Sequence, residues 1–325
     1  MNTPTTPDGL SSGLDETAGR LHRRPWPPFT PLRADLDLSF ELFPPATPAG
    51  MDTMQRCLEQ LAGLSPRFMS VTYGAGGSTQ DRTFKSLDTI LRETPVPAAA
   101  HLTCVGKSRA DVDAIVDRYV EMGVTHIVAL RGDPPEGETD GRHVDGYQSA
   151  ADLVAGVRRR CDLDISVAAY PEVHPRAASA EADMDNLKRK LNAGATQALT
   201  QFFFDADDFL RFFDRARAAG ITAPIVPGIM PITNFTKVSG FSQRCGASVP
   251  DWLSELFDGL DELPDVRELV AATVAAEQCR RLLENGIRSF HFYTMNKPQL
   301  TAAVCRILGV RPTSTGTNTI DVAAS

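Results

Sequence analysis

The sequence of 325 residues contains no long hydrophobic run, and no stretch approaches the roughly 18 uncharged apolar residues of a membrane span. It also lacks an excess of positive charge, because 33 Lys and Arg are outnumbered by 41 Asp and Glu, for a net charge of -8. A nucleic-acid partner calls for a clustered basic surface, so we expect none. The N-terminus has no apolar segment flanked by basic residues, so we expect neither a secretory signal nor an anchor and predict a cytoplasmic location.

The cysteine and histidine patterns do not indicate a metal site. The six cysteines are scattered, and no two lie at the spacing of a metal knuckle or a redox motif, so we expect reduced, unpaired thiols. His101, His174 and His291 stand at or near predicted strand ends, where barrel hydrolases assemble metals. An adjacent His-x-His pair and a clear bridging carboxylate are missing, so we interpret these histidines as hydrogen-bonding or packing residues and predict no metal.

Eight short apolar, β-branched or aromatic runs each end at a polar or charged side chain, and a helix-like stretch follows each. The runs lie at 38–41, 69–73, 99–102, 127–133, 165–170, 198–203, 225–229 and 290–293. Alternating strands and helices favour a parallel sheet, and eight units close a (β/α)8 TIM barrel, an α/β fold whose active site lies where the strands end. The side chains predicted to ring that mouth are Glu41, Thr72, His101, Asp133, Tyr170, Gln201 and Tyr293.

The barrel is predicted to span residues 37–311 as one catalytic domain. Residues 1–36 and 312–325 are rich in Pro, Thr, Ser and Gly, a composition that buries too little apolar surface to order itself, so both are predicted to be disordered tails. Helices are predicted at 51–64, 80–93, 108–122, 148–161, 179–193, from Asp205 to Gly220, 264–285 and 297–308. The segment from Asn234 to Gly259 is long and carries several aromatic side chains, so we expect a loop at the mouth that covers substrate.

Two carboxyl groups at predicted strand ends have different surroundings. Glu41 stands among Phe40, Leu42 and two prolines, where desolvation disfavours the charged form and suits an acid that works near neutral pH. Asp133 follows Arg131 and Gly132, and a charge-stabilising neighbour and open backbone would keep it ionised. Two environments indicate two roles in proton transfer.

The segments that carry these residues resemble, in order and spacing, the short bacterial form of methylenetetrahydrofolate reductase, over about residues 37–311. The resemblance rests on the motifs at 39–45, 71–75, 101–104, 129–133, 168–175, 200–205, 227–231 and 290–296. It implies an enzyme with FAD across the barrel mouth, which takes a hydride from NADH or NADPH and then reduces methylenetetrahydrofolate to methyltetrahydrofolate. It also implies a homo-oligomer.

The resemblance assigns roles to individual residues. Glu41 is implied as the general acid at the folate bridge nitrogen, and Asp133 as the carboxylate that binds the pterin and tunes the flavin. FAD-binding residues are implied to be Thr72, Tyr73, Ala75, His101, Arg131, Gly132, Asp133, Tyr147, Ala168, Tyr170, His174, Asp183, Asn186, Arg189 and Lys190. Substrate-binding residues are implied to be Glu41, Thr72, Asp133, Gln201, Phe241, Tyr293 and Lys297. On a predicted helix, Asp183, Asn186 and Lys190 recur at i, i+3 and i+7 and therefore share one face.

Two positions depart from the family pattern, and two other functions stay open. Val238 stands where glutamine is common and Lys297 where arginine is common, so binding of the folate tail is expected to differ. A lyase or isomerase without flavin would use Glu41 and Asp133 as an acid and base pair, and a catalytically silent barrel would serve as a binding scaffold. The sequence favours neither NADH nor NADPH, because this architecture has no separate nucleotide fold with a diagnostic ribose-binding acid.

Overall fold

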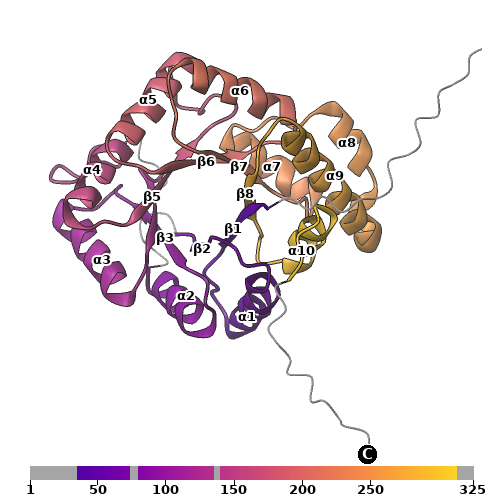
Figure 1. The fold of residues 1–325 in the computed structure, drawn as a ribbon, viewed down its shortest axis with the longest axis horizontal. Coiled ribbons are helices and arrows are strands. Elements are labelled where there is room, and N and C mark those ends of the chain that lie inside the picture. The colour runs from indigo at the N-terminus through magenta and orange to yellow at the C-terminus, as the bar shows by residue number, and fades with distance from the viewer. Residues whose placement is uncertain (1–34, 74–79, 135–139, 313–325) are drawn as a thin grey trace, which may run out of the picture. The chain divides into compact units, whose positions relative to one another are not determined.

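In the computed structural model, which describes residues 35–73, 80–134 and 140–312, eight parallel strands pair in chain order and close into a barrel (Figure 1). The strands are β1 (Asp37–Leu42), β2 (Phe68–Val71), β3 (Ala98–Thr103), β4 (His126–Leu130), β5 (Asp164–Ala169), β6 (Gln197–Phe202), β7 (Ile225–Ile229) and β8 (Ser289–Tyr293). The last strand pairs with the first, with Glu41 opposite Tyr293. The predicted TIM barrel is therefore confirmed.

Helices follow the strands around the outside of the barrel (Figure 1). They are α1 (Pro48–Ala62), α2 (Gln80–Glu93), α3 (Arg109–Met122), α4 (Ala150–Arg160), α5 (Ala180–Asn192), α6 (Ala206–Ala218), α7 (Phe235–Cys245), α8 (Asp251–Phe257), α9 (Pro264–Glu284) and α10 (Pro298–Ile307), with a 3-10 turn η2 (Leu260–Glu262) before α9. A capping box starts α3: the Ser108 side chain accepts a hydrogen bond from the backbone N–H of Asp111. The Asp111 carboxylate in turn accepts a hydrogen bond from the backbone N–H of Ser108.

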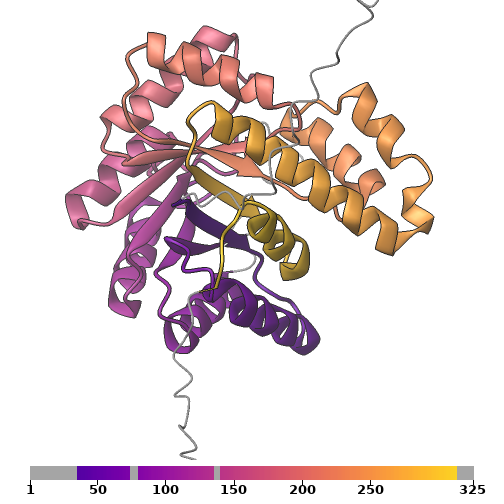
Figure 2. The same ribbon diagram turned by 45° about the vertical axis from the view of Figure 1, so that its right-hand side comes forward.

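The segment after β7 is helical rather than the loop that we expected. Asn234 caps α7 by accepting a hydrogen bond from the backbone N–H of Lys237, and the rings of Phe235 and Phe257 stack with centroids 5.4 Å apart. These two contacts order the segment, and Figure 2 shows α7, α8 and α9 together on one side of the barrel. Of the aromatic side chains in this segment, Phe241 lines a cavity at the mouth, and it is 41% exposed.

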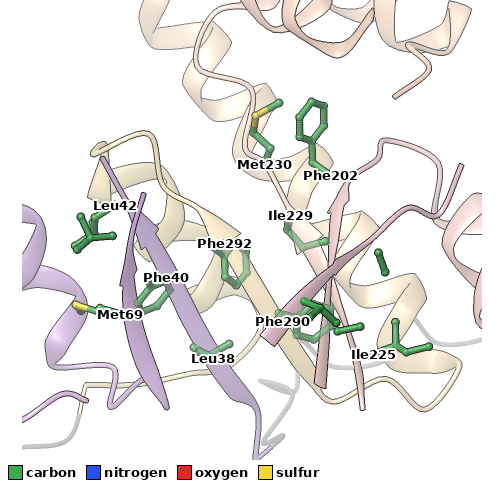
Figure 3. Packing of buried hydrophobic residues seen from close by; sticks show 14 of the residues in the cluster. Leu38, Phe40, Leu42, Met69, Phe202, Ile225, Ile229, Met230, Phe290 and Phe292 are labelled. Atoms are coloured by element: carbon green, nitrogen blue, oxygen red, sulfur yellow. The ribbon is translucent and has the colours of Figure 1, made fainter. Parts of the chain in front are cut away.

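Alternation along the strands separates an outer core from the barrel interior. On β1, Leu38, Phe40 and Leu42 pack in the main core between strands and helices (Figure 3). Because successive side chains of a strand point to opposite faces, Ser39 and Glu41 face the interior. A small apolar cluster fills part of that interior, formed by Phe68, Ala99, Val128, Leu199 and Val226. The interior of the barrel is thus a packed core rather than a pore.

The predicted tails fall almost wholly outside the described residues, so their predicted disorder stays a prediction. β1 begins at Asp37 and α10 ends at Ile307, close to the expected limits of the barrel. Among the residues that the structure describes, no helix is long and apolar enough to cross a membrane.

Candidate active site

A buried carboxylate between two imidazoles stands at the centre of the site. Glu41 is 7% exposed, and its Oε2 atom lies 3.3 Å from Nε2 of His101 on β3 and 3.7 Å from Nε2 of His291 on β8. Nδ1 of His291 lies 2.8 Å from Oγ of Ser39, two residues before Glu41 on β1. Three strands that are distant in sequence therefore bring one acid, two bases and a hydroxyl together inside the barrel.

The ionisation of Glu41 differs from our expectation of a carboxyl that stays protonated near neutral pH. Burial raises its pKa, as expected, but the interactions with His101 and then His291 outweigh burial and lower the pKa of Glu41 to about 2. Both Nε2 atoms are buried and make no other hydrogen bond with a described residue, so Glu41 is the polar group that they face. The sequence around Glu41 shows its apolar neighbours but not the two histidines supplied by other strands.

Glu41 lines a cavity of about 230 Å³ at the carboxyl ends of the strands. Four residues predicted to bind substrate line it, namely Glu41, Gln201, Phe241 and Tyr293, and His101 lines it as well. The hydroxyl of Tyr293 donates to the carbonyl oxygen of Thr200 at 2.7 Å, and Phe241 stacks on Phe202 with centroids 5.7 Å apart. The register of β6 against β7 shifts between Leu199 and Phe202. An irregularity of this kind changes the direction of nearby side chains, such as that of Gln201.

A larger cleft of about 550 Å³ adjoins this cavity, and Leu130, Ala168 and Tyr170 line both. Most residues predicted to bind FAD line the cleft: Arg131, Gly132, Asp133, Ala168, Tyr170, His174, Asp183, Asn186, Arg189 and Lys190. The predicted polar face of α5 is therefore the wall of a cleft rather than a solvated surface.

Polar contacts fix the wall of this larger cleft. The backbone N–H of His174 donates to Asp183 at 3.1 Å, and the His174 ring lies edge-on to Tyr170 with centroids 4.5 Å apart. Lys190 is 5% exposed, its ammonium donates to the carbonyl oxygen of Ala168, and burial lowers its pKa to about 8. A buried cation at the wall of a cleft indicates a site for an anionic group.

The charge-stabilising neighbour of Asp133 is not the one that the sequence suggested. Arg131 lies 3.9 Å from Asp140, whereas Asp133 pairs with Arg176 at 3.1 Å. Sequence reasoning missed Arg176 altogether, because the loop after β5 carries no motif for it. It also missed Ser39, for which the alternation of β1 was an available signal, since positions i and i+2 share a face.

The remaining predicted residues lie elsewhere. Thr72, Tyr73 and Tyr147 line neither cavity, and the Tyr147 hydroxyl donates to Asp113 at 2.6 Å. Lys297 precedes α10 and is exposed, while Val238 is buried in α7, so neither departure from the family pattern lines the cavities. Ala75 lies outside the described residues.

The cleft suits a cofactor that carries phosphate. Arg131, Arg176, Arg189 and Lys190 line it against the two carboxylates of Asp133 and Asp183. Nη2 of Arg131 is buried and has no hydrogen-bond partner among the described residues, so it is a donor that a bound anion would satisfy. The part of the chain that the structure describes contains no group of three or more His, Cys, Asp or Glu side chains placed to hold a metal ion.

A sequence model of the methylenetetrahydrofolate reductase family matches residues 31–309. The chain belongs to the methylenetetrahydrofolate reductase family. It is 47% identical to the 5,10-methylenetetrahydrofolate reductase of Pectobacterium carotovorum subsp. carotovorum over 281 residues, which are 86% of this chain and 93% of that protein. The 5,10-methylenetetrahydrofolate reductase of Escherichia coli is 43% identical over the same shares of the two chains.

Two further proteins are similar to this chain. Methylenetetrahydrofolate reductase (NADH) 1 of Zea mays is 36% identical over 84% of this chain, but the match covers only 48% of the plant protein. A solved structure of an uncharacterized protein from Clostridium thermocellum, which binds two copies of 5-methyl-5,6,7,8-tetrahydrofolic acid, aligns with a TM-score of 0.56 and 16% identity. That alignment covers 85% of this chain and 95% of the other, and it shows that the two chains have a similar fold.

Proposed function

We propose that this chain reduces 5,10-methylenetetrahydrofolate to 5-methyltetrahydrofolate, with FAD as cofactor and NADH or NADPH as the reductant. The observation that carries the proposal is the pair of adjoining cavities, one lined by cations and the other holding a buried acid between two imidazoles. Bound flavin supplies the chemistry of hydride acceptance and donation, in two half-reactions that use one site in turn.

The cations of the larger cleft would hold the FAD. Arg131, Arg189 and Lys190 offer charge to its phosphates, and Asp183 offers carboxylate oxygens to its hydroxyl groups. Tyr170, Leu130 and Ala168 line the junction of the two cavities, where the flavin ring would meet the substrate. Gln201 and Phe241 would then bind the pterin or the nicotinamide, by hydrogen bonding and by stacking.

Glu41 is proposed as the group that protonates the bridge nitrogen of the folate. Opening the five-membered ring needs a proton at that nitrogen and negative charge near the cation that results. In the open site the low pKa of Glu41 leaves the carboxylate charged, with the Nε2 atoms of His101 and His291 within 4 Å of it. Bound pterin would exclude water from the cavity, and loss of water favours the neutral carboxylic acid that can donate the proton.

Replacement of Glu41 by glutamine tests this role. In Glu41→Gln we expect FAD to be retained and NADH to reduce the flavin at the wild-type rate, while reduction of methylenetetrahydrofolate falls about 100- to 10,000-fold, the usual contribution of a general acid. Rapid mixing of each substrate separately measures the two half-reactions. The control is Glu59→Gln, the same change at an exposed position of α1, which should leave both half-reactions unchanged.

The colour of the protein separates this proposal from a flavin-free lyase or isomerase. A reductase is yellow when purified and bleaches under NADH without oxygen. A protein that cannot be loaded with FAD, or a Glu41→Gln variant with unchanged folate turnover, would contradict the proposed mechanism. Homo-oligomer formation and a cytoplasmic location stay predictions, which sedimentation and fractionation address.

A further inference from the structure

The ion pair between Asp133 and Arg176 joins two loops at the rim of the larger cleft. Asp133 follows β4 and Arg176 follows β5, both line the cleft, and Nη2 of Arg176 lies 3.1 Å from Oδ1 of Asp133. The Asp133 side chain is 87% exposed and that of Arg176 is 42% exposed. Asp133 makes no other ion pair with a described residue.

The loop that carries Arg176 is held in place by its neighbours. Both carboxylate oxygens of Glu172 accept from the backbone N–H of Ser248, at 2.8 and 3.1 Å. Pro175 lies so close to Gly246 that a Cβ at that glycine would meet it at 2.7 Å. The backbone N–H of Arg176 donates to Nδ1 of His174 at 3.0 Å. The backbone at Arg176 is thus fixed, whereas its guanidinium is hydrogen-bonded to Asp133 alone among the described residues.

We propose that Arg176 is a positioning residue that competes with the pterin for the carboxylate of Asp133. This inference rests on the proposed function and on the role that the family resemblance implies for Asp133, which is to bind the pterin. A guanidinium bound to one carboxylate oxygen occupies acceptor capacity that the pterin would use, and it neutralises part of the charge. The pair therefore opens as folate binds, and the long side chain of Arg176 swings out while its backbone stays fixed.

Competition predicts a change in folate affinity whose direction is opposite to that expected from a purely structural role. Removing the guanidinium frees Asp133, so folate should bind more tightly rather than less. An exposed ion pair contributes little, and its loss corresponds to about a two- to fivefold change in affinity. Salt weakens such a pair, so the advantage of the variant over the wild type should shrink as ionic strength rises.

The experiment titrates 5-methyltetrahydrofolate into FAD-loaded, oxidised protein by calorimetry at low and high salt. We expect Arg176→Gln to lower the dissociation constant about two- to fivefold at low salt, with a matching fall in KM. Arg176→Lys should stay near the wild type, because it keeps the charge. Arg280→Gln on α9, whose partner is Glu277, removes one positive charge far from the cleft and should change nothing.

Equal or weaker binding by Arg176→Gln would overturn the role of Arg176, and weaker binding would mean that Arg176 contacts the folate directly. A fall in affinity common to Arg176→Gln and Arg280→Gln would show that net charge governs binding, which also overturns it. Failure of the proposed function is distinct: the wild-type holoenzyme would then neither bind 5-methyltetrahydrofolate nor reduce methylenetetrahydrofolate.

Discussion

Replacing Gly228 by alanine should damage the fold and the active site together. Gly228 lies on β7, and a Cβ built there would stand 2.2 Å from the carbonyl oxygen of Thr200 and 2.6 Å from Cε2 of Tyr293. The same carbonyl accepts the Tyr293 hydroxyl, and the backbone N–H of Gly228 donates to Oγ1 of Thr200. The added methyl group must therefore push β7 away from β6, or move a ring that lines the substrate cavity.

The size of the effect follows from which atoms obstruct the methyl group. Overpacking of a core costs about 1 to 3 kcal/mol, and we expect the upper end because the nearest atom belongs to the backbone, which cannot turn aside. For a domain of this size, a loss of about 3 kcal/mol lowers Tm by roughly 6 to 10 °C. Because Tyr293 faces the cavity, KM for the folate should also rise.

Calorimetric unfolding of the FAD-free protein measures the change in Tm. The matched control is Gly240→Ala in α7, where nothing lies within 4 Å of the new methyl group. There the substitution should stabilise the helix by about 0.5 to 1 kcal/mol, since glycine is a poor helix former. An unchanged Tm in Gly228→Ala would refute the reasoning, because the strands would then have room that the geometry denies.

Two further predictions concern buried titratable groups. Burial lowers the pKa of His126 from 6.5 to about 4, so the unfolded chain takes up a proton before the folded one does. The contribution of neutral His126 to the free energy of unfolding is fully present above pH 6.5, and about 3 kcal/mol is lost as the pH falls towards 4. In His126→Gln, Tm should therefore fall less steeply with decreasing pH over this range. In Lys190→Met we expect FAD affinity, measured by quenching of flavin fluorescence, to fall about 10- to 100-fold, because the charge that we propose for the FAD phosphates is lost. The Tm of the FAD-free protein should change little, because loss of the hydrogen bond to Ala168 is offset by removal of a buried charge. Unchanged affinity would remove Lys190 from the FAD site.

Local patterns in the sequence were sufficient to predict the barrel. The repeat of strand and helix, together with caps such as Ser108, depends on neighbours along the chain, and the strand limits agree with the structure to within a few residues. The face of α5 that carries Asp183, Asn186 and Lys190 follows from helical spacing, and it lines the larger cleft. The predicted family then supplied roles that no spacing contains.

Contacts between segments that are distant along the chain could not be predicted from the sequence. The helices after β7 depend partly on the stacking of Phe235 on Phe257, and the partner of Asp133 is Arg176, 43 residues away. Reasoning from neighbours placed Arg131 beside Asp133, because the two are close in sequence, but side chains two residues apart in a loop need not face each other. Burial was predictable for Glu41, whereas the sign of its pKa shift depends on which groups share the cavity.

The choice of histidine as the partner of Glu41 has a functional reason. A buried carboxylate must be paired, because an isolated charge in the interior costs several kcal/mol. Lysine or arginine would satisfy the charge but would keep its own proton, since their pKa values lie far above neutral. Imidazole pairs with the carboxylate and can also release the proton near pH 7. With Ser39 at Nδ1 of His291, and both imidazoles close to Oε2 of Glu41, the interior places groups that can exchange a proton directly beside the acid.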